Sequence, residues 1–437
     1  MAEPPINQPA SAPADAPSPE PRGRAESDRK PLLFIFITVL LDVTGLAIII
    51  PVLPELISEV SGEPGVVITL SEAAVIGGWL MFAYAFMQFL AAPVLGNLSD
   101  AYGRRPVLLT GLAVLGLDYL IMALAPTLVW LFIGRTLAGM AAATITTAFA
   151  YIADITPKEK RAARFGLVGA AFGVGFILGP AIGGVLGTLD VRLPFFAAAT
   201  LCFLNFAFGL FVLPESLSRE RRRPFELRRA NPVGTLIALA PLKPIMFLIL
   251  AYAGLEFAFQ VYPAVWAYFT PVMYGWSTAQ VGLSLAFIGV LITFAEGFLI
   301  RVALKRIGEH GVVVGSILVS IVAMALLAFV TTSWGALLVM VFAGISGVGT
   351  TALQALASGA VDETRQGEIT GAITSAKSMV FFLAPPMMTG LFAAFTREGG
   401  SLPYLPGAPF LFAAIICCLV FWPYGRARRL GIDTTNP

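Results

Sequence analysis

The chain has 437 residues, of which 57% are hydrophobic and only 12% are charged. A soluble globular protein carries about 25% charged residues, so most of this chain is expected to lie in lipid. The net charge of +2 does not indicate nucleic acid as a partner. The three cysteines all fall in apolar runs, which argues against both a disulfide framework and a metal site.

Residues 1–30 contain seven prolines by position 21 and no apolar stretch of the kind found in signal peptides. Such a segment cannot bury enough apolar surface to fold, so we predict a disordered cytoplasmic tail. The remaining segments are predicted to be a first bundle over 31–213, a cytoplasmic linker over 214–243, a second bundle over 244–425 and a cytoplasmic tail over 426–437.

Twelve apolar runs follow the tail, each close to the roughly 20 residues that a bilayer crossing requires. The longest polar interruption among them separates six runs from six. We therefore predict an all-α membrane protein with 12 transmembrane helices in two related six-helix bundles, the plan of many transporters. The runs cover 32–53, 73–95, 106–125, 128–153, 163–187, 194–213, 244–269, 278–300, 311–331, 334–357, 369–396 and 405–425.

The distribution of positive charge predicts the orientation. If the N-terminus is cytoplasmic, the inner segments hold 24 of the 28 Lys and Arg residues. The outer loops hold only Arg192 and Arg397, and the remaining two, Arg135 and Lys377, lie inside apolar runs. Because positively charged loops stay on the cytoplasmic side, both termini are expected to be cytoplasmic.

A short polar stretch, Gly96–Pro106, joins the second and third runs. We expect Gly96 and Gly103 to allow a tight reversal, and Asp100 to accept backbone hydrogen bonds or to pair with an arginine. Arg104 and Arg105 could simply hold the loop in the cytoplasm. The pattern nevertheless resembles the loop between helices 2 and 3 of the major facilitator superfamily, with Ala101 where that family often has a basic residue.

The fifth run carries small residues about four apart around a proline. This spacing makes a flat helix face that a neighbouring backbone can approach closely, and Pro180 favours a kink. Generic tight packing would explain the glycines, but the pattern resembles a motif of proton-driven exporters in the superfamily. We expect it to pack against a helix of the other half near the outer side. The motif comprises Gly166, Gly175, Gly179, Pro180, Gly183 and Gly184.

Ionisable residues inside the first four runs are candidates for proton coupling. Asp42 lies a third to halfway into the first run, where burial favours the protonated form unless a cation such as Arg135 offsets it. Arg135 should face the bundle interior and find a carboxylate, either as a structural ion pair or for proton transfer, as the resemblance implies. Asp118 in the third run joins this set, and Asp154, at the end of the fourth, could pair with Arg104 in a gate.

Several phrases resemble the tetracycline exporters over nearly the whole chain after residue 31. They include Leu41–Gly45, Gln88, Leu117–Leu120, Tyr151–Asp154 and Asn97–Val107. A further match is Pro263–Trp266, followed by Phe269–Thr270 and Tyr274–Trp276. The resemblance implies proton-coupled drug efflux by alternating access across the bacterial inner membrane.

The second half departs from that family. Its histidine and aspartate positions hold Ile292 and Ser320 here, and the single histidine, His310, falls in a predicted surface loop. Glu296 could line the substrate site or merely pair with Arg301 or Lys305. The aromatic residues of the seventh run could line the site or pack on neighbouring helices. The substrate-binding candidates are Gln88, Glu256, Gln260, Trp266, Glu296 and Lys377.

Two other functions compete with drug efflux. A transporter of a sugar, an osmolyte or another metabolite would use the same fold, but the fifth-run motif and the shortage of paired polar side chains argue against it. A membrane enzyme would need a catalytic set within the spans, and the sequence offers none. We expect a monomer that uses the proton gradient without a resident cofactor, with a divalent cation as an optional companion of the drug.

Overall fold

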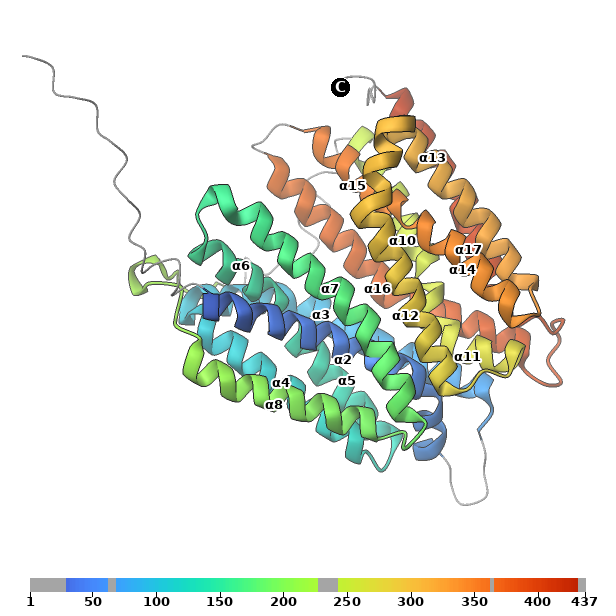
Figure 1. Cartoon of the computed structure of the whole chain (residues 1–437), viewed down its shortest axis with the longest axis horizontal. Coiled ribbons are helices and arrows are strands. Elements are labelled where there is room, and N and C mark those ends of the chain that lie inside the picture. The colour runs from blue at the N-terminus through green and yellow to red at the C-terminus, as the bar shows by residue number, and fades with distance from the viewer. Residues whose placement is uncertain (1–28, 62–67, 227–242, 362–364, 431–437) are drawn as a thin grey trace, which may run out of the picture.

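The computed structural model describes residues 29–61, 68–226, 243–361 and 365–430. Within these ranges all regular structure is helical, and the helices form two groups (Figure 1). The first group comprises α2 (Arg29–Ser61), α3 (Leu70–Tyr102), α4 (Arg104–Leu124), α5 (Leu128–Ala142), α6 (Ile145–Ile155), α7 (Lys158–Gly187) and α8 (Leu193–Val212), followed by the short η1 (Arg219–Arg221). The second comprises α10 (Lys243–Phe259), α11 (Val261–Tyr274), α12 (Thr278–Phe294), the π-helix η3 (Ala295–Leu299), α13 (Ile300–Phe329), α14 (Ser333–Ser346), α15 (Val348–Gly359), α16 (Gln366–Thr396) and α17 (Ala408–Arg429).

Eleven stretches in the described ranges are long and apolar enough to cross a membrane. One of them, Thr278–Phe329, has 52 residues, which would extend about 78 Å at 1.5 Å per residue. That length is more than twice the hydrocarbon core of about 30 Å, so the stretch must cross twice. Gly308 supplies the reversal with φ of 65° and ψ of 174°, and the chain folds back between α12 and α13 (Figure 1). The prediction of an all-α protein with twelve crossing segments is therefore confirmed.

Several crossing segments are interrupted within the membrane. The fourth breaks between α5 and α6 at Ala143 and Thr144, the seventh between α10 and α11 at Gln260, and the tenth between α14 and α15 at Gly347. The eighth contains η3, a π-helix. Such irregular backbone is tolerated at membrane depth where protein or water satisfies it, and in transporters it commonly lies near the substrate and ion sites.

The helices run between two ends of the molecule, the hinge side and the far side. The hinge side is the end at which α3 turns into α4 at Gly103, and the far side is the opposite end, where α2 stops at Ser61 and α16 at Thr396. On the hinge side the prediction about Gly96 is wrong. Helix α3 continues to Tyr102, so the chain reverses at Gly103 alone, whose φ of 110° suits glycine.

Side-chain hydrogen bonds accompany this extra helical turn. The Asn97 amide donates to the Pro93 carbonyl at 3.2 Å, and the Ser99 hydroxyl donates to the Gly96 carbonyl at 2.8 Å. Polar residues that read as a loop in the sequence thus bond back to the helix. A Cβ added to Gly96 would meet nothing within 4 Å, so this position has no steric need for glycine.

Helices α7 and α12 join the two groups by close backbone approach. A Cβ at Gly184 would lie only 2.8 Å from the Thr278 carbonyl oxygen, and a Cβ at Gly282 would overlap the Pro180 carbonyl. Further toward the hinge side, a Cβ at Gly173 would still lie 3.2 Å from the Thr293 hydroxyl. Small residues therefore set the spacing between these helices over most of their length on the far side.

The close contact between α7 and α12 ends one helical turn further toward the hinge side. Added Cβ atoms at Gly169 of α7 and at Gly297 of η3 would meet nothing within 4 Å. The two groups diverge toward the hinge side (Figure 1).

The glycine motif of α7 thus serves two different neighbours. Gly184 and Pro180 meet α12 of the other group, as expected. Gly175, Gly179 and Gly183 instead lie against α2 of their own group, where a Cβ at Gly179 would be 2.7 Å from the Thr44 carbonyl. Gly166 faces open space. The expectation that the whole motif packs on the other half is therefore wrong for four of its six members, because the motif holds two rows of residues four apart, offset by one residue, and the two rows lie on different faces of the helix.

Helices α3 and α16 form the second junction between the groups. At the far side, the hydroxyls of Ser71 and Thr396 are hydrogen-bonded at 2.8 Å. Further along, the Phe382 ring lies 5.5 Å from the rings of both Phe86 and Phe89, measured between centroids. A hydrogen bond from the Thr278 hydroxyl to the Glu55 carboxylate adds a third link at the far side. The far side is therefore closed in this arrangement.

Replacing Gly184 with valine should open the far side, because the new side chain would overlap the backbone of α12. We expect a lower disulfide yield between cysteines at positions 71 and 396, introduced into a chain whose three native cysteines are replaced. Gly166→Val is the matched control, since it adds the same bulk to the same helix where there is space. Equal yields in the two variants would contradict the importance of this crossing.

Candidate functional site

A buried ion pair lies inside the first group. The Arg135 guanidinium of α5 donates a hydrogen bond to Asp118 of α4, and their exposed fractions are 4% and 0%. The guanidinium carbon also lies 5.8 Å from the centre of the Tyr84 ring of α3. Arg135 thus faces the bundle interior and finds a carboxylate, since a lone arginine in lipid is costly.

This pair is incompletely hydrogen-bonded. Within the described part of the chain, Asp118 Oδ1 and Arg135 Nε have no hydrogen-bond partner. Buried polar atoms are nearly always paired, so an unpaired carboxylate oxygen beside a guanidinium marks a place where a proton or a water molecule can be accepted.

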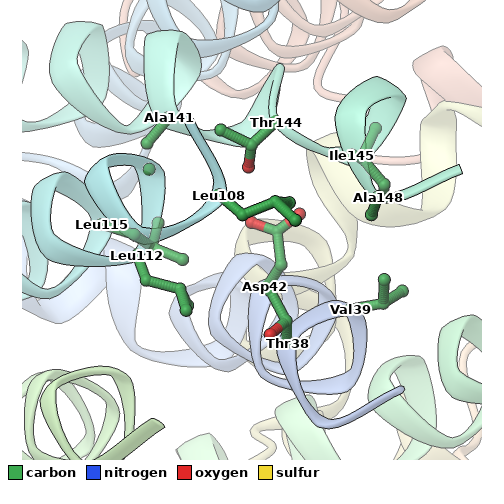
Figure 2. Close-up of a pocket in the computed structure, with 11 residues that line it drawn as sticks. Thr38, Val39, Asp42, Leu108, Leu112, Leu115, Ala141, Thr144, Ile145 and Ala148 are labelled. Carbon is green, nitrogen blue, oxygen red and sulfur yellow. The ribbon is translucent and has the colours of Figure 1, made fainter. Parts of the chain in front are cut away.

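Asp42 of α2 lines a separate cavity of about 10 Å³, which has room for about one water molecule. Figure 2 shows its carboxylate pointing toward Leu108 of α4, with Thr144 beyond, at the break between α5 and α6. The other lining residues are Thr38, Val39, Gly111, Leu112, Leu115, Ala141, Ile145 and Ala148. Apart from two hydroxyls the wall is apolar, so a charge on Asp42 has little solvation there.

Two tyrosines lie close to these groups. The Tyr84 ring of α3 lies beside the Arg135 guanidinium, and the Tyr119 side chain of α4 lies against Gly45 of α2. Sequence reasoning missed both, although Tyr119 follows Asp118 directly and Tyr84 lies one helical turn before Gln88. It also left open that Arg135 might offset the charge of Asp42, whereas the arginine is paired with Asp118.

The gating candidates meet at the hinge. The Arg104 guanidinium lies 2.5 Å from Asp100 and 3.3 Å from Asp154, and it donates to the Ser99 hydroxyl at 2.6 Å. Arg105 donates to the Leu210 carbonyl at 2.8 Å. The arginines therefore hold specific partners within the first group, and Asp100 is paired with Arg104 rather than with the start of α16.

One hinge residue was not predicted. Glu215 follows α8 and accepts hydrogen bonds from the backbone N–H groups of Arg104 at 2.8 Å and Arg105 at 3.3 Å. These are unsatisfied donors at the N-terminus of α4, where a carboxylate is favoured by the helix dipole. An acidic residue shortly after a membrane span was the available signal in the sequence.

The substrate-binding candidates of the second group lie on separate helices. Glu296 of η3 accepts a hydrogen bond from the Thr351 hydroxyl of α15 at 3.4 Å. The partner of this carboxylate is therefore Thr351, rather than Arg301 or Lys305. Gln260 is 95% buried at the break between α10 and α11, and Gln88 is half-buried on α3.

Trp266 does not belong with these residues. Its side chain is fully buried, its indole N–H donates to the Ser284 hydroxyl at 2.9 Å, and its ring packs on Phe410 with centroids 6.0 Å apart. The prediction that it contacts a substrate is wrong, because the aromatic residues of this span form the core of the second group. His310 is likewise no free surface residue, since it bridges Tyr424 and Arg428 of α17.

Twelve crossing segments in two groups, with an ion pair and carboxylates inside, are the features of a secondary transporter. A profile of the Major Facilitator Superfamily matches residues 35–385, and the chain belongs to this family of membrane transporters. It is therefore a multi-pass membrane protein that moves small molecules, and it is not an enzyme.

Individual relatives agree with this assignment. The chain is 39% identical to the tetracycline resistance protein of class C from Escherichia coli, over 89% of this chain and 95% of that protein. It is 32% identical to the class H protein from Pasteurella multocida, over 93% and 99% of the two chains. A bacterial homologue of the human lysosomal transporter Spinster, solved in an inward-facing and occupied conformation, shares the fold with a TM-score of 0.73. It is 15% identical, over 93% and 98% of the two chains. The resemblance deduced from the sequence is confirmed.

Replacing Asp118 with asparagine should destabilise the protein by about 3–5 kcal/mol, because Arg135 would remain buried without a counter-charge. Thermal unfolding of the detergent-solubilised protein measures this change. The control is Glu368→Gln, which removes one partner of the exposed pair with Arg365 and should change stability by less than about 1 kcal/mol. The neutral double variant Asp118→Asn/Arg135→Gln distinguishes a structural ion pair from a pair that takes part in proton transfer. Restored stability with full transport would mean a purely structural pair.

Proposed function

We propose that the protein exports tetracycline-like or other amphipathic drugs across the bacterial inner membrane in exchange for protons. The observation that carries the proposal is the 39% identity to a tetracycline resistance protein over nearly the full length of both chains. This similarity does not favour the alternative of a sugar, osmolyte or metabolite transporter on the same fold.

The distribution of charge supports an orientation for the cycle. The segments predicted to be cytoplasmic hold 24 of the 28 Lys and Arg residues, and Arg104 and Arg105 among them lie on the hinge side, which supports placing that side and both termini in the cytoplasm. The arrangement described above is then closed toward the outside and open toward the cytoplasm. A monomer in this state would load drug from the cytoplasm, and closure of the hinge side would expose the drug to the exterior.

The geometry of the first group supports proton coupling. Asp42 lies in a mostly apolar cavity with room for about one water molecule, so few polar groups surround its carboxyl group. Asp118 and Arg135 form a buried ion pair in the same group, beside the Tyr84 ring. A proton taken up by Asp42 would neutralise its charge and so alter the relative stability of the two states.

The proton gradient is the only energy source that this proposal requires. A divalent cation would travel with the drug as cargo rather than occupy a resident site. Among the described residues, no group of three or more His, Cys, Asp or Glu side chains could hold a metal ion.

Asp42→Asn should abolish drug accumulation in everted membrane vesicles supplied with a proton gradient, because the asparagine cannot take up and release a proton. Protein in the membrane, measured by immunoblot, should stay at the level of the unmodified chain. Asp190→Asn, in a turn at the far side, is the matched control and should transport normally. Full accumulation by the Asp42 variant would remove this residue from coupling.

The hinge should act as a latch when the cytoplasmic side closes. Asp100 would then dock at the N-terminus of α16, whose partial positive charge favours a carboxylate, and charge-assisted hydrogen bonds there would contribute about 1–3 kcal/mol. Asp100→Asn should weaken that closed state and severely reduce efflux. The measurement is disulfide formation between cysteines placed at Ala101 and Gln366, which should fall in the Asp100 variant. Unchanged cross-linking would show that the loop serves topology alone.

A further inference from the structure

Two adjacent glycines of α3 receive hydroxyl groups from two helices of the second group. A Cβ at Gly77 would overlap the hydroxyl of Tyr268 on α11, and a Cβ at Gly78 would overlap the hydroxyl of Thr389 on α16. Both glycines lie about two turns from the start of α3, toward the far side. These contacts between the groups therefore belong to the closure of the far side.

The two hydroxyls differ in their hydrogen bonding. The Thr389 hydroxyl donates to the Pro385 carbonyl of its own helix at 2.9 Å. Tyr268 is only 3% exposed, and its hydroxyl has no hydrogen-bond partner among the described residues. Its neighbours at Gly77 include the apolar side chain of Ile57 on α2. A buried hydroxyl without a partner loses the bonds that water would supply, so the closed arrangement carries a free-energy cost at this point.

The position of Tyr268 connects that cost with opening of the far side. Tyr268 belongs to the second group, whereas Gly77 and Ile57 belong to the first. Separation of the groups at the far side would uncover the hydroxyl, and water could then bond to it. The cost is therefore present when the far side is closed and absent when it is open. It offsets part of the dense packing at Gly184 and Gly282, which favours closure.

We propose that Tyr268 is a gating residue of the far side, whose unpaired hydroxyl keeps the closed arrangement from becoming too stable to open. The inference rests on the alternating access of the proposed function and not on the identity of the drug. A carrier must open and close this side in every cycle, so an overly stable closed state would slow release of the drug. Tyr268→Phe should accordingly strengthen closure, whereas most substitutions of buried residues weaken the structure around them.

A second tyrosine of the same helix provides the matched control. Tyr262 is 5% exposed, and its hydroxyl also lacks a hydrogen-bond partner among the described residues. Its ring, however, packs against Phe410 of its own group, with centroids 5.9 Å apart. Tyr262→Phe therefore removes the same atom from the interior of one group, whereas Tyr268→Phe removes it from the contact between the groups.

Alkylation of a single cysteine measures opening of the far side. Thr396 is buried and bonded to Ser71 across the junction of α3 and α16, so Thr396→Cys should react with a charged maleimide only when the far side opens. The reference chain carries this substitution, with its three native cysteines replaced. Adding Tyr268→Phe should lower the alkylation rate about tenfold, the effect of one unsatisfied hydroxyl. Adding Tyr262→Phe should leave the rate unchanged.

A third variant tests the contact from the other side. Gly77→Ala should raise the alkylation rate of the reference chain, because the new methyl group would overlap the Tyr268 hydroxyl. Combining it with Tyr268→Phe should remove much of that increase, since the nearest remaining ring atom would lie 3.0 Å from the methyl carbon.

The inference is overturned if Tyr268→Phe reacts as fast as the reference chain or faster, or if Tyr262→Phe slows the reaction equally. A reference chain that is never alkylated would contradict alternating access, and the inference with it. Drug accumulation in vesicles tests the proposed function separately. If no drug accumulates although the alkylation rates change as expected, the proposed function is wrong and the gating role of Tyr268 stands.

Discussion

The close crossing of α7 and α12 is the contact on which the observed arrangement depends. Backbone atoms of the two helices approach so closely at Gly184 and Gly282 that no side chain fits between them. Lipid supplies no hydrophobic driving force between helices, so dense packing and a few hydrogen bonds must hold the two groups together. The junction of α3 with α16 has the same character, with Ser71 bonded to Thr396 at its far end. Beyond these contacts the two groups diverge toward the hinge side, so the molecule has one closed side and one diverging side.

The cost of charge in lipid determines what lies inside each group. In the first, Arg135 and Asp118 neutralise each other, and Asp42 lies beside a small space between α2, α4 and the break after α5. In the second, the charged residues lie at the diverging side, where water can reach them. In this arrangement the first group therefore keeps Asp118 and Arg135 buried, while the second exposes Glu296 and Lys377. This asymmetry suits a carrier in which one half handles protons and the other meets the substrate.

Much of this architecture could be predicted from the sequence, because apolar runs and positive loops follow directly from the properties of a bilayer. The glycine motif was predictable as a packing surface, but its division between α2 and α12 was not, since that depends on how far each helix rotates. Trp266 was misassigned because the sequence alone does not distinguish an aromatic residue in a helical core from one in a binding site. Gly96 was misread because the end of α3 is set by side-chain hydrogen bonds from Asn97 and Ser99, which composition does not reveal. Glu215 was missed because its hydrogen bonds to the start of α4 join segments that are distant in the sequence.

The size of the space beside Asp42 has a consequence for ion selectivity. A sodium ion needs several oxygen ligands to replace its hydration shell, and a space for about one water molecule cannot admit the ion with that shell. The wall offers one carboxylate and the hydroxyls of Thr38 and Thr144 amid alkyl groups, too few oxygens to take the place of the water. A proton needs neither volume nor a ligand shell, because it becomes part of the carboxyl group. The geometry of this small space therefore favours a proton over a sodium ion at Asp42.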